Sequence, residues 1–144
     1  MCEKYLMENL TATILLGEDN PADVYLIRQA LEENGVKYTL NVASHGGEML
    51  SALSRTEVPD LIVLDLNLPR YDGLELLKLI RDNSALSEIP VVILTSSDSP
   101  KDRVAASQLG AACYIRKPSR LDEFMAIGET LQSLLEGRHT TAAP

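Results

Sequence analysis

Leu61-Ile62-Val63-Leu64-Asp65 is a run of four apolar residues that ends in a carboxylate. Its apolar residues stand at successive positions rather than alternate ones, which is typical of a strand covered on both faces in a parallel sheet. Similar runs occur at residues 13–17, 90–95 and 112–116. Residues 38–42 alternate more, which suits an edge strand. The sequence therefore predicts five strands.

The segments between these runs carry helical patterns. Asn20-Pro21-Ala22-Asp23 and Ser99-Pro100-Lys101-Asp102 each supply a capping residue, a proline for the first turn and an acid that faces the helix dipole. Asp72 and Ser119 can cap two further helices, and residues 47–55 place leucines on one face. We therefore expect five helices in strict alternation with the five strands.

This alternation predicts one α/β domain. Right-handed crossovers give an open, doubly wound parallel sheet of flavodoxin-like (βα)5 type, with the strand order 2-1-3-4-5. Ligands of such sheets bind at the carboxyl ends of the strands where the strand order reverses, here between strands one and three. We expect the domain to span residues 11–136, between an N-terminal extension at 1–10 and a disordered tail at 137–144.

Composition excludes several classes of function. The chain has 144 residues, 21 acidic and 13 basic, and a formal net charge of −8. Such a charge repels phosphate backbones, so we expect no nucleic-acid partner. No apolar run approaches the roughly 20 residues that span a membrane, so we expect no membrane partner and a cytoplasmic protein.

Acidic residues follow the first and third predicted strands. Glu18-Asp19 comes directly after the first run, and Asp65 ends the third. Carboxylates this close repel each other unless a cation or protons neutralise them. A few oxygen ligands suit Mg²⁺, or Mn²⁺ in its place. In the alternative interpretation, Glu18 and Asp19 only cap the next helix, although Asn20 already serves that purpose.

Thr95 and Lys117 follow the fourth and fifth strands at the same edge of the sheet. Asp65 is ionised at neutral pH, so it can attack an activated phosphoryl group and form an acyl phosphate without a general base. The Thr95 hydroxyl and the Lys117 ammonium can bind the other phosphoryl oxygens as charge develops. The pattern thus predicts a phosphoacceptor site.

The sequence resembles the receiver domains of bacterial two-component response regulators, typified by the chemotaxis regulator. The resemblance covers residues 13–135 and implies the same fold. Residues 20–23 and 65–73 look most like the stand-alone response regulators of bacterial and cyanobacterial phytochromes. The matching blocks are Glu18-Asp19, Leu64-Asp65-Leu66-Asn67-Leu68-Pro69, Gly73, Thr95 and Lys117-Pro118.

The resemblance implies that Asp65 is the phosphoacceptor for a sensor histidine kinase, possibly a phytochrome. Asp19, Asp65 and the backbone carbonyl of Asn67 would hold Mg²⁺, with Glu18 acting through water.

The resemblance also implies how the modification is sensed. Thr95 and Lys117 would contact the phosphoryl group, and Thr95 would move toward it. Tyr114 matches the switch aromatic, which swings inward when the threonine moves. The Lys117-Pro118 peptide bond would be cis.

Two other classes of function share parts of this pattern. Phosphatases of the haloacid dehalogenase type also use a strand-end aspartate, but they need a second Asp two residues later, where this chain has Asn67. A degenerate receiver would act only as a protein-binding adaptor, which the complete set of acid, hydroxyl and lysine residues argues against. We therefore expect a signalling protein, not an enzyme. Its aspartyl phosphate would hydrolyse slowly, at a rate that Asn67 and Ser97 tune.

Only one helix and a short tail are expected after the fifth strand, so the signal should leave by contact with another protein. We expect a homodimer through the helices at 99–110 and 119–135 and the strand at 112–116. The apolar pair at 134–135 lies beyond the length needed to cover the sheet, so we expect it to contribute to an interface. We expect the contacted protein to be a downstream target or a second copy of this chain.

Overall fold

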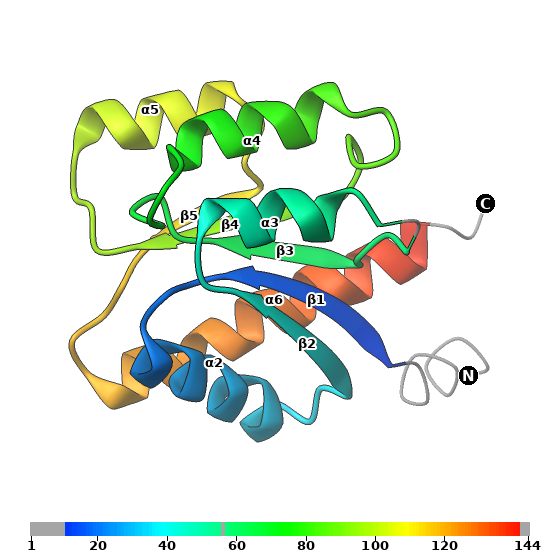
Figure 1. Ribbon diagram of the computed structural model, residues 1–144. Coiled ribbons are helices and arrows are strands. Elements are labelled where there is room, and N and C mark those ends of the chain that lie inside the picture. The colour runs from blue at the N-terminus through cyan, green and yellow to red at the C-terminus, as the bar shows by residue number, and fades with distance from the viewer. Residues whose placement is uncertain (1–10, 56, 142–144) are drawn as a thin grey trace.

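The computed structural model describes residues 11–55 and 57–141 and gives backbone positions alone for 138–141. Five strands alternate with five helices over this part of the chain (Figure 1). In chain order they are β1 (Ala12–Gly17), α2 (Pro21–Glu33), β2 (Tyr38–Ala43), α3 (Gly46–Leu53), β3 (Leu61–Leu64), α4 (Gly73–Asp82), β4 (Val91–Thr95), α5 (Pro100–Gln108), β5 (Cys113–Arg116) and α6 (Leu121–Thr141).

The strands form one parallel sheet in the order β2-β1-β3-β4-β5, which confirms the predicted topology. Helices α2 and α6 cover one face, and α3, α4 and α5 cover the other (Figure 1). No helix among the described residues is long and apolar enough to cross a membrane.

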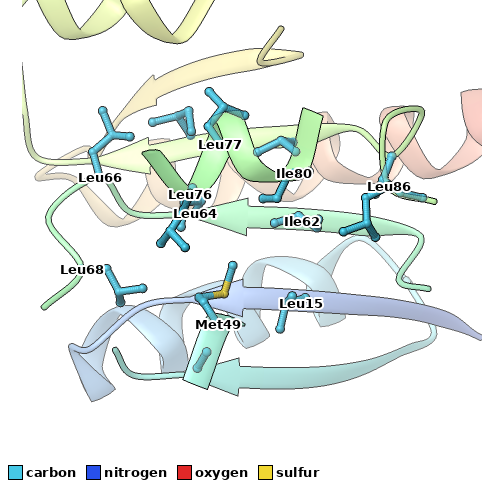
Figure 2. Close-up of a cluster of buried hydrophobic side chains, with 14 of the residues drawn as sticks. Leu15, Met49, Ile62, Leu64, Leu66, Leu68, Leu76, Leu77, Ile80 and Leu86 are labelled. Atoms are coloured by element: carbon cyan, nitrogen blue, oxygen red, sulfur yellow. The ribbon is translucent and has the colours of Figure 1, made fainter. Parts of the chain in front are cut away.

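Successive strand residues point to opposite faces, which explains the unbroken apolar runs. Figure 2 shows Leu15, Ile62 and Leu64 of the central strands packed with side chains of α3 and α4. The neighbouring strand residues face α2 and α6 instead. That second cluster, the α2–α6 core, comprises Ala12, Ile14, Leu16, Ile27, Leu31, Leu61, Val63, Val92, Leu94, Phe124, Ile127, Leu131 and Leu135.

Three of the predicted helix caps are confirmed. The Asn20 side chain accepts a hydrogen bond from the Ala22 N–H at 2.9 Å, and Asp72 and Ser99 cap α4 and α5 in the same way. Each bond satisfies an N–H group that has no partner inside the helix.

The cap predicted for α6 is wrong by one residue. The carbonyl of Arg120, not of Ser119, accepts the first helical hydrogen bond, from the Phe124 N–H at 3.0 Å. The Arg120 guanidinium bonds Asp122 at 3.2 Å and also lies near Glu123. Arg120 thus occupies the capping position and contacts two acids of the first helical turn.

The end of the chain also differs from the sequence prediction. Residues 137–141, assigned above to a disordered tail, continue α6, because Gly137 keeps an ordinary negative φ and does not break the helix. Leu135 is only 5% exposed and belongs to the α2–α6 core, and Leu134 packs against it. Leu135 is therefore a core residue rather than part of an interface, and Leu134 is partly buried against that core. The predicted extension at 1–10 lies outside the described residues.

Gly128 lets α6 approach α2 closely. A Cβ atom at Gly128 would lie 2.2 Å from the Ala30 carbonyl oxygen and 2.3 Å from Asn34 Nδ2. Asn34 Nδ2 donates to that same carbonyl at 2.8 Å, and Gln132 Nε2 donates to the Asn34 carbonyl at 3.0 Å. The two helices are thus joined by backbone contact and by hydrogen bonds.

We predict that Gly128→Ala lowers the free energy of unfolding by about 1–3 kcal/mol, because the new methyl group meets backbone that cannot yield cheaply. Urea denaturation measures the change. Gly137→Ala is the matched control: no atom lies within 4 Å of its added Cβ, so stability should be unchanged or rise by up to about 1 kcal/mol. Equal stabilities of the two variants would contradict the close α2–α6 contact.

Candidate functional site

The sheet ladder continues into the predicted site residues. The Glu18 N–H donates to the Ala43 carbonyl at 2.9 Å, and the Asp65 N–H donates to the Gly17 carbonyl at 3.0 Å. After β5, the Lys117 N–H donates to the carbonyl of Thr95 in β4 at 2.8 Å. Neighbouring strands therefore fix the backbones of these three residues at the carboxyl ends of the strands.

Glu18, Asp19 and Asp65 each offer an oxygen, and the three ligand atoms lie within 4.8 Å of one another. The Glu18 and Asp65 side chains are almost fully buried, at 1% and 4% exposure, whereas Asp19 is exposed. Hard oxygen donors, two of them buried and one exposed, suit Mg²⁺ or Mn²⁺, which keep several waters. The structure thus brings together the carboxylates that the sequence predicted to converge.

The Lys117 ammonium lies among three carboxylates. Its Nζ is 2.8 Å from Asp65 Oδ2, 2.9 Å from Glu18 Oε1 and 2.8 Å from Asp23 Oδ2. The contact with Asp23 was not predicted, because that residue stands in the first turn of α2 and was interpreted only as an acid facing the helix dipole.

The pKa values of this cluster reflect burial opposed by ion pairing. Burial raises the pKa of the Glu18 carboxyl, and its hydrogen bond with Lys117 offsets only part of that effect. Burial by itself would lower the pKa of Lys117, but hydrogen bonds to Asp23, Asp65 and Glu18 outweigh it and raise that pKa. Lys117 is therefore a permanent cation inside the crevice.

Thr95 is fully buried beside the acidic cluster. Its Oγ1 accepts hydrogen bonds from the Ser97 N–H at 3.3 Å and from Asn67 Nδ2 at 3.4 Å. The Asn67 N–H in turn donates to Asp65 Oδ1 at 2.9 Å. Asn67 therefore contacts both the predicted acceptor and the predicted threonine.

Ser97 connects the buried threonine to Tyr114. Its N–H bonds Thr95, and its carbonyl accepts a hydrogen bond from the Tyr114 hydroxyl at 3.2 Å. The Ser97 side chain points elsewhere and lies 2.7 Å from Asp102 Oδ2. Arg103 places its guanidinium 4.6 Å from the centre of the Tyr114 ring, a cation–π contact that the sequence analysis missed.

The loop after Asp65 is held tightly. A Cβ at Gly73 would lie 2.5 Å from Leu66 Cα, so only glycine lets the start of α4 approach this backbone. Arg70 has φ of 68°, a left-handed conformation that is unfavourable for a side chain other than glycine. The surrounding contacts therefore impose one conformation on this loop.

The cis conformation expected at Lys117-Pro118 is wrong. No peptide bond among the described residues is cis. The trans form is favoured even before proline, by about 0.5–1 kcal/mol. With the trans bond, the Lys117 ammonium already reaches its carboxylates, so nothing in the site requires the rarer isomer.

Residues 14–128 match the model of the response regulator receiver domain family. The chain is 34% identical over 131 residues to the response regulator Rcp1 of Synechocystis, covering 87% of this chain and 89% of Rcp1. It is 36% identical over 117 residues to the response regulator MprA of Mycobacterium ulcerans, covering 81% of this chain but only 48% of MprA.

Solved structures show the same likeness. The phosphorylated cyanobacterial phytochrome response regulator RcpA superposes with a TM-score of 0.80 at 34% identity, covering 88% of this chain and 94% of RcpA. The Mn²⁺-bound form of Rcp1 superposes with a TM-score of 0.78 at 34% identity, covering 85% of this chain and 92% of Rcp1.

We predict that Lys117→Met lowers the free energy of unfolding in the presence of a chelator by about 3 kcal/mol, because it leaves buried carboxylates without a counter-charge. Saturating Mg²⁺ should recover part of the loss by binding the folded state. Urea denaturation under both conditions tests this.

Arg116→Met is the matched control, since the neighbouring Arg116 makes an exposed ion pair with Asp98 at 3.3 Å. That pair should contribute less than about 1 kcal/mol. Equal losses in the two variants would refute the buried role of Lys117.

Proposed function

This chain belongs to the response regulator receiver domain family, and we propose that it is a phosphoacceptor signalling protein whose Asp65 takes a phosphoryl group from a sensor histidine kinase. Receiver domains of this kind act with such kinases in two-component systems. The observation that carries the proposal is the placement of Asp65, a buried carboxylate with Oδ1 on the Asn67 N–H and Oδ2 on the Lys117 ammonium.

The transfer needs little from the protein beyond orientation and charge. An oxygen of the ionised Asp65 carboxylate forms a bond to phosphorus, while the bond between phosphorus and the kinase histidine nitrogen breaks. The other nitrogen of that ring carries a proton, so the nitrogen released from phosphorus keeps the electron pair and the ring leaves as a neutral imidazole. The Thr95 hydroxyl and the Lys117 ammonium are placed to bind the phosphoryl oxygens as charge develops.

Receiver domains bind a divalent metal at an acidic pocket, and in this chain Asp19, Asp65 and the backbone carbonyl of Asn67 would hold it, with Glu18 acting through water. Mg²⁺ or Mn²⁺ would neutralise the clustered negative charge when bound. The oxygen donor set and the similarity to Mn²⁺-bound Rcp1 support this assignment.

We propose that the kinase is phytochrome-like and that signalling takes place in the cytoplasm. The similarity to RcpA and Rcp1 supports the phytochrome-like kinase.

Asn67, an amide where a phosphatase needs an acid, supports an acceptor that stores the phosphoryl group and releases it slowly. The hydrogen bonds from Thr95 through Ser97 to Tyr114 supply a route from Asp65 toward α5 and β5.

We predict that incubation with acetyl phosphate and Mg²⁺ adds one phosphoryl group to the wild-type chain and none to Asp65→Asn, because the amide is no nucleophile. Intact-protein mass spectrometry reads the product. Asp98→Asn, which removes an exposed carboxylate, should gain mass as the wild type does. No gain in the wild type, or an equal gain in Asp65→Asn, would refute the acceptor.

We predict that Asn67→Ala lengthens the lifetime of the acyl phosphate several-fold, because a polar group that can orient the attacking water beside Asp65 is lost. Ser97→Ala should have a smaller effect, since its hydroxyl bonds Asp102 rather than Thr95. Release of inorganic phosphate after removal of the donor measures both lifetimes. Unchanged lifetimes in both variants would exclude the proposed tuning.

We also propose that the chain forms a homodimer through α5, β5 and α6. This end of the sheet carries two large apolar side chains in water, Val104 at 55% exposure on α5 and Leu121 at 65% on α6. Exposed side chains of this kind gain most when a second copy covers them.

We predict that Val104→Glu lowers the dimer fraction in sedimentation velocity at micromolar concentrations, because a charge would be buried in the interface. Val58→Glu, at an exposed valine outside α5, β5 and α6, is the control and should leave it unchanged. A wild-type chain that sediments only as monomer, with and without phosphorylation, would rule the dimer out.

A further inference from the structure

The Lys117 ammonium has three N–H donors, and three carboxylates use them. Any new anionic oxygen that contacts Lys117 must therefore displace a carboxylate. Two of the present acceptors, Glu18 and Asp65, belong to the cluster that can hold a cation, whereas Asp23 does not. Asp23 is thus the one partner that Lys117 can keep when the other two turn to a divalent cation.

We propose that Asp23 is a positioning residue that holds the Lys117 ammonium in the crevice and so frees Glu18 and Asp65 for a divalent cation. The inference rests on the cation site of the proposed function. It deepens that function by adding an acid from α2 that contacts neither the cation nor the phosphoryl group but acts through Lys117.

Asp23 is held where this role requires it. It lies in the first turn of α2, whose start is fixed by the Asn20 cap, and its carboxylate is largely shielded from water. An acid in the first turn of a helix is favourable by itself through the helix dipole. That effect alone does not place Oδ2 at 2.8 Å from a lysine 94 residues away in the sequence.

The alternative arrangement shows what Asp23 contributes. Without its carboxylate, the partly buried ammonium would rest on Glu18 and Asp65 alone, and an incoming cation would compete with it for both. With Asp23 present, the ammonium keeps one short ion pair outside the cation cluster. The effect of Asp23 on cation binding should therefore depend on Lys117, whereas a simple effect of its charge at a distance should not.

A double-mutant cycle separates these two effects. Isothermal titration calorimetry with Mn²⁺ would give the dissociation constant for the wild-type chain, Asp23→Asn, Lys117→Met and the double variant. We expect Asp23→Asn to weaken binding roughly fivefold when Lys117 is present, and by less than about twofold in the Lys117→Met background. Glu75→Gln is the control, because it removes an exposed acid from the first turn of α4.

If circular dichroism shows that Lys117→Met does not fold, a comparison of Asp23→Glu with Asp23→Asn still tests the proposal. Asp23→Glu keeps a carboxylate in reach of Lys117 and should stay within about twofold of the wild type, unlike Asp23→Asn. Equal weakening by Asp23→Asn in both backgrounds, or by Asp23→Glu and Asp23→Asn alike, would overturn the positioning role.

The titration is independent of phosphorylation. If the wild type bound no Mn²⁺, both the cation site and the role of Asp23 would be refuted. If the cycle showed the expected dependence on Lys117 while acetyl phosphate added no mass, only the phosphoacceptor function would fail.

Discussion

Attraction between the Lys117 ammonium and the carboxylates around it stabilises the candidate site at the carboxyl ends of the strands. A parallel sheet delivers the ends of its strands to one edge, and here it brings Glu18 and Asp65 together in a place where water is largely excluded. Two buried carboxylates with oxygens within 4.8 Å of each other would repel each other strongly. The Lys117 ammonium offsets this repulsion, and the backbone of Lys117, which follows β5, is held by a hydrogen bond to β4.

The convergence of Glu18, Asp65 and Lys117 could be predicted because it needs only strand ends and strand order. Apolar runs locate the strand ends, and the right-handed crossover rule gives the order. Asp23 escaped prediction because its role depends on where one helix lies relative to a lysine far away in sequence. Ser97 was expected only to tune hydrolysis, and its link from Thr95 to Tyr114 escaped prediction because the backbone makes both contacts and has no signature in the side chain.

The predictions about the end of α6 and about the Lys117-Pro118 peptide bond were wrong because the sequence signal for each was weak. Residues 137–144 were expected to be a disordered tail, but α6 continues through 137–141 because Gly137 does not adopt the left-handed turn that ends a helix. A Lys-Pro pair permits the cis bond without requiring it. Leu134 and Leu135 were expected at an interface because they lie beyond the length needed to cover the strands. The neighbouring helix α2 extends the surface that α6 covers, so the core reaches these two residues.

The packing of α6 against α2 also bears on how the chain folds as it is synthesised. The α2–α6 core combines residues from β1 and α2, near the start of the domain, with Phe124, Ile127, Leu131 and Leu135 of α6. A ribosome releases the early elements well before α6 emerges, and chains grow at about 5–20 residues per second. The part of the sheet that α6 covers therefore stays exposed for seconds, while α2 and the helices of the opposite face are already available. The nascent domain must pass through this half-covered state in every round of translation.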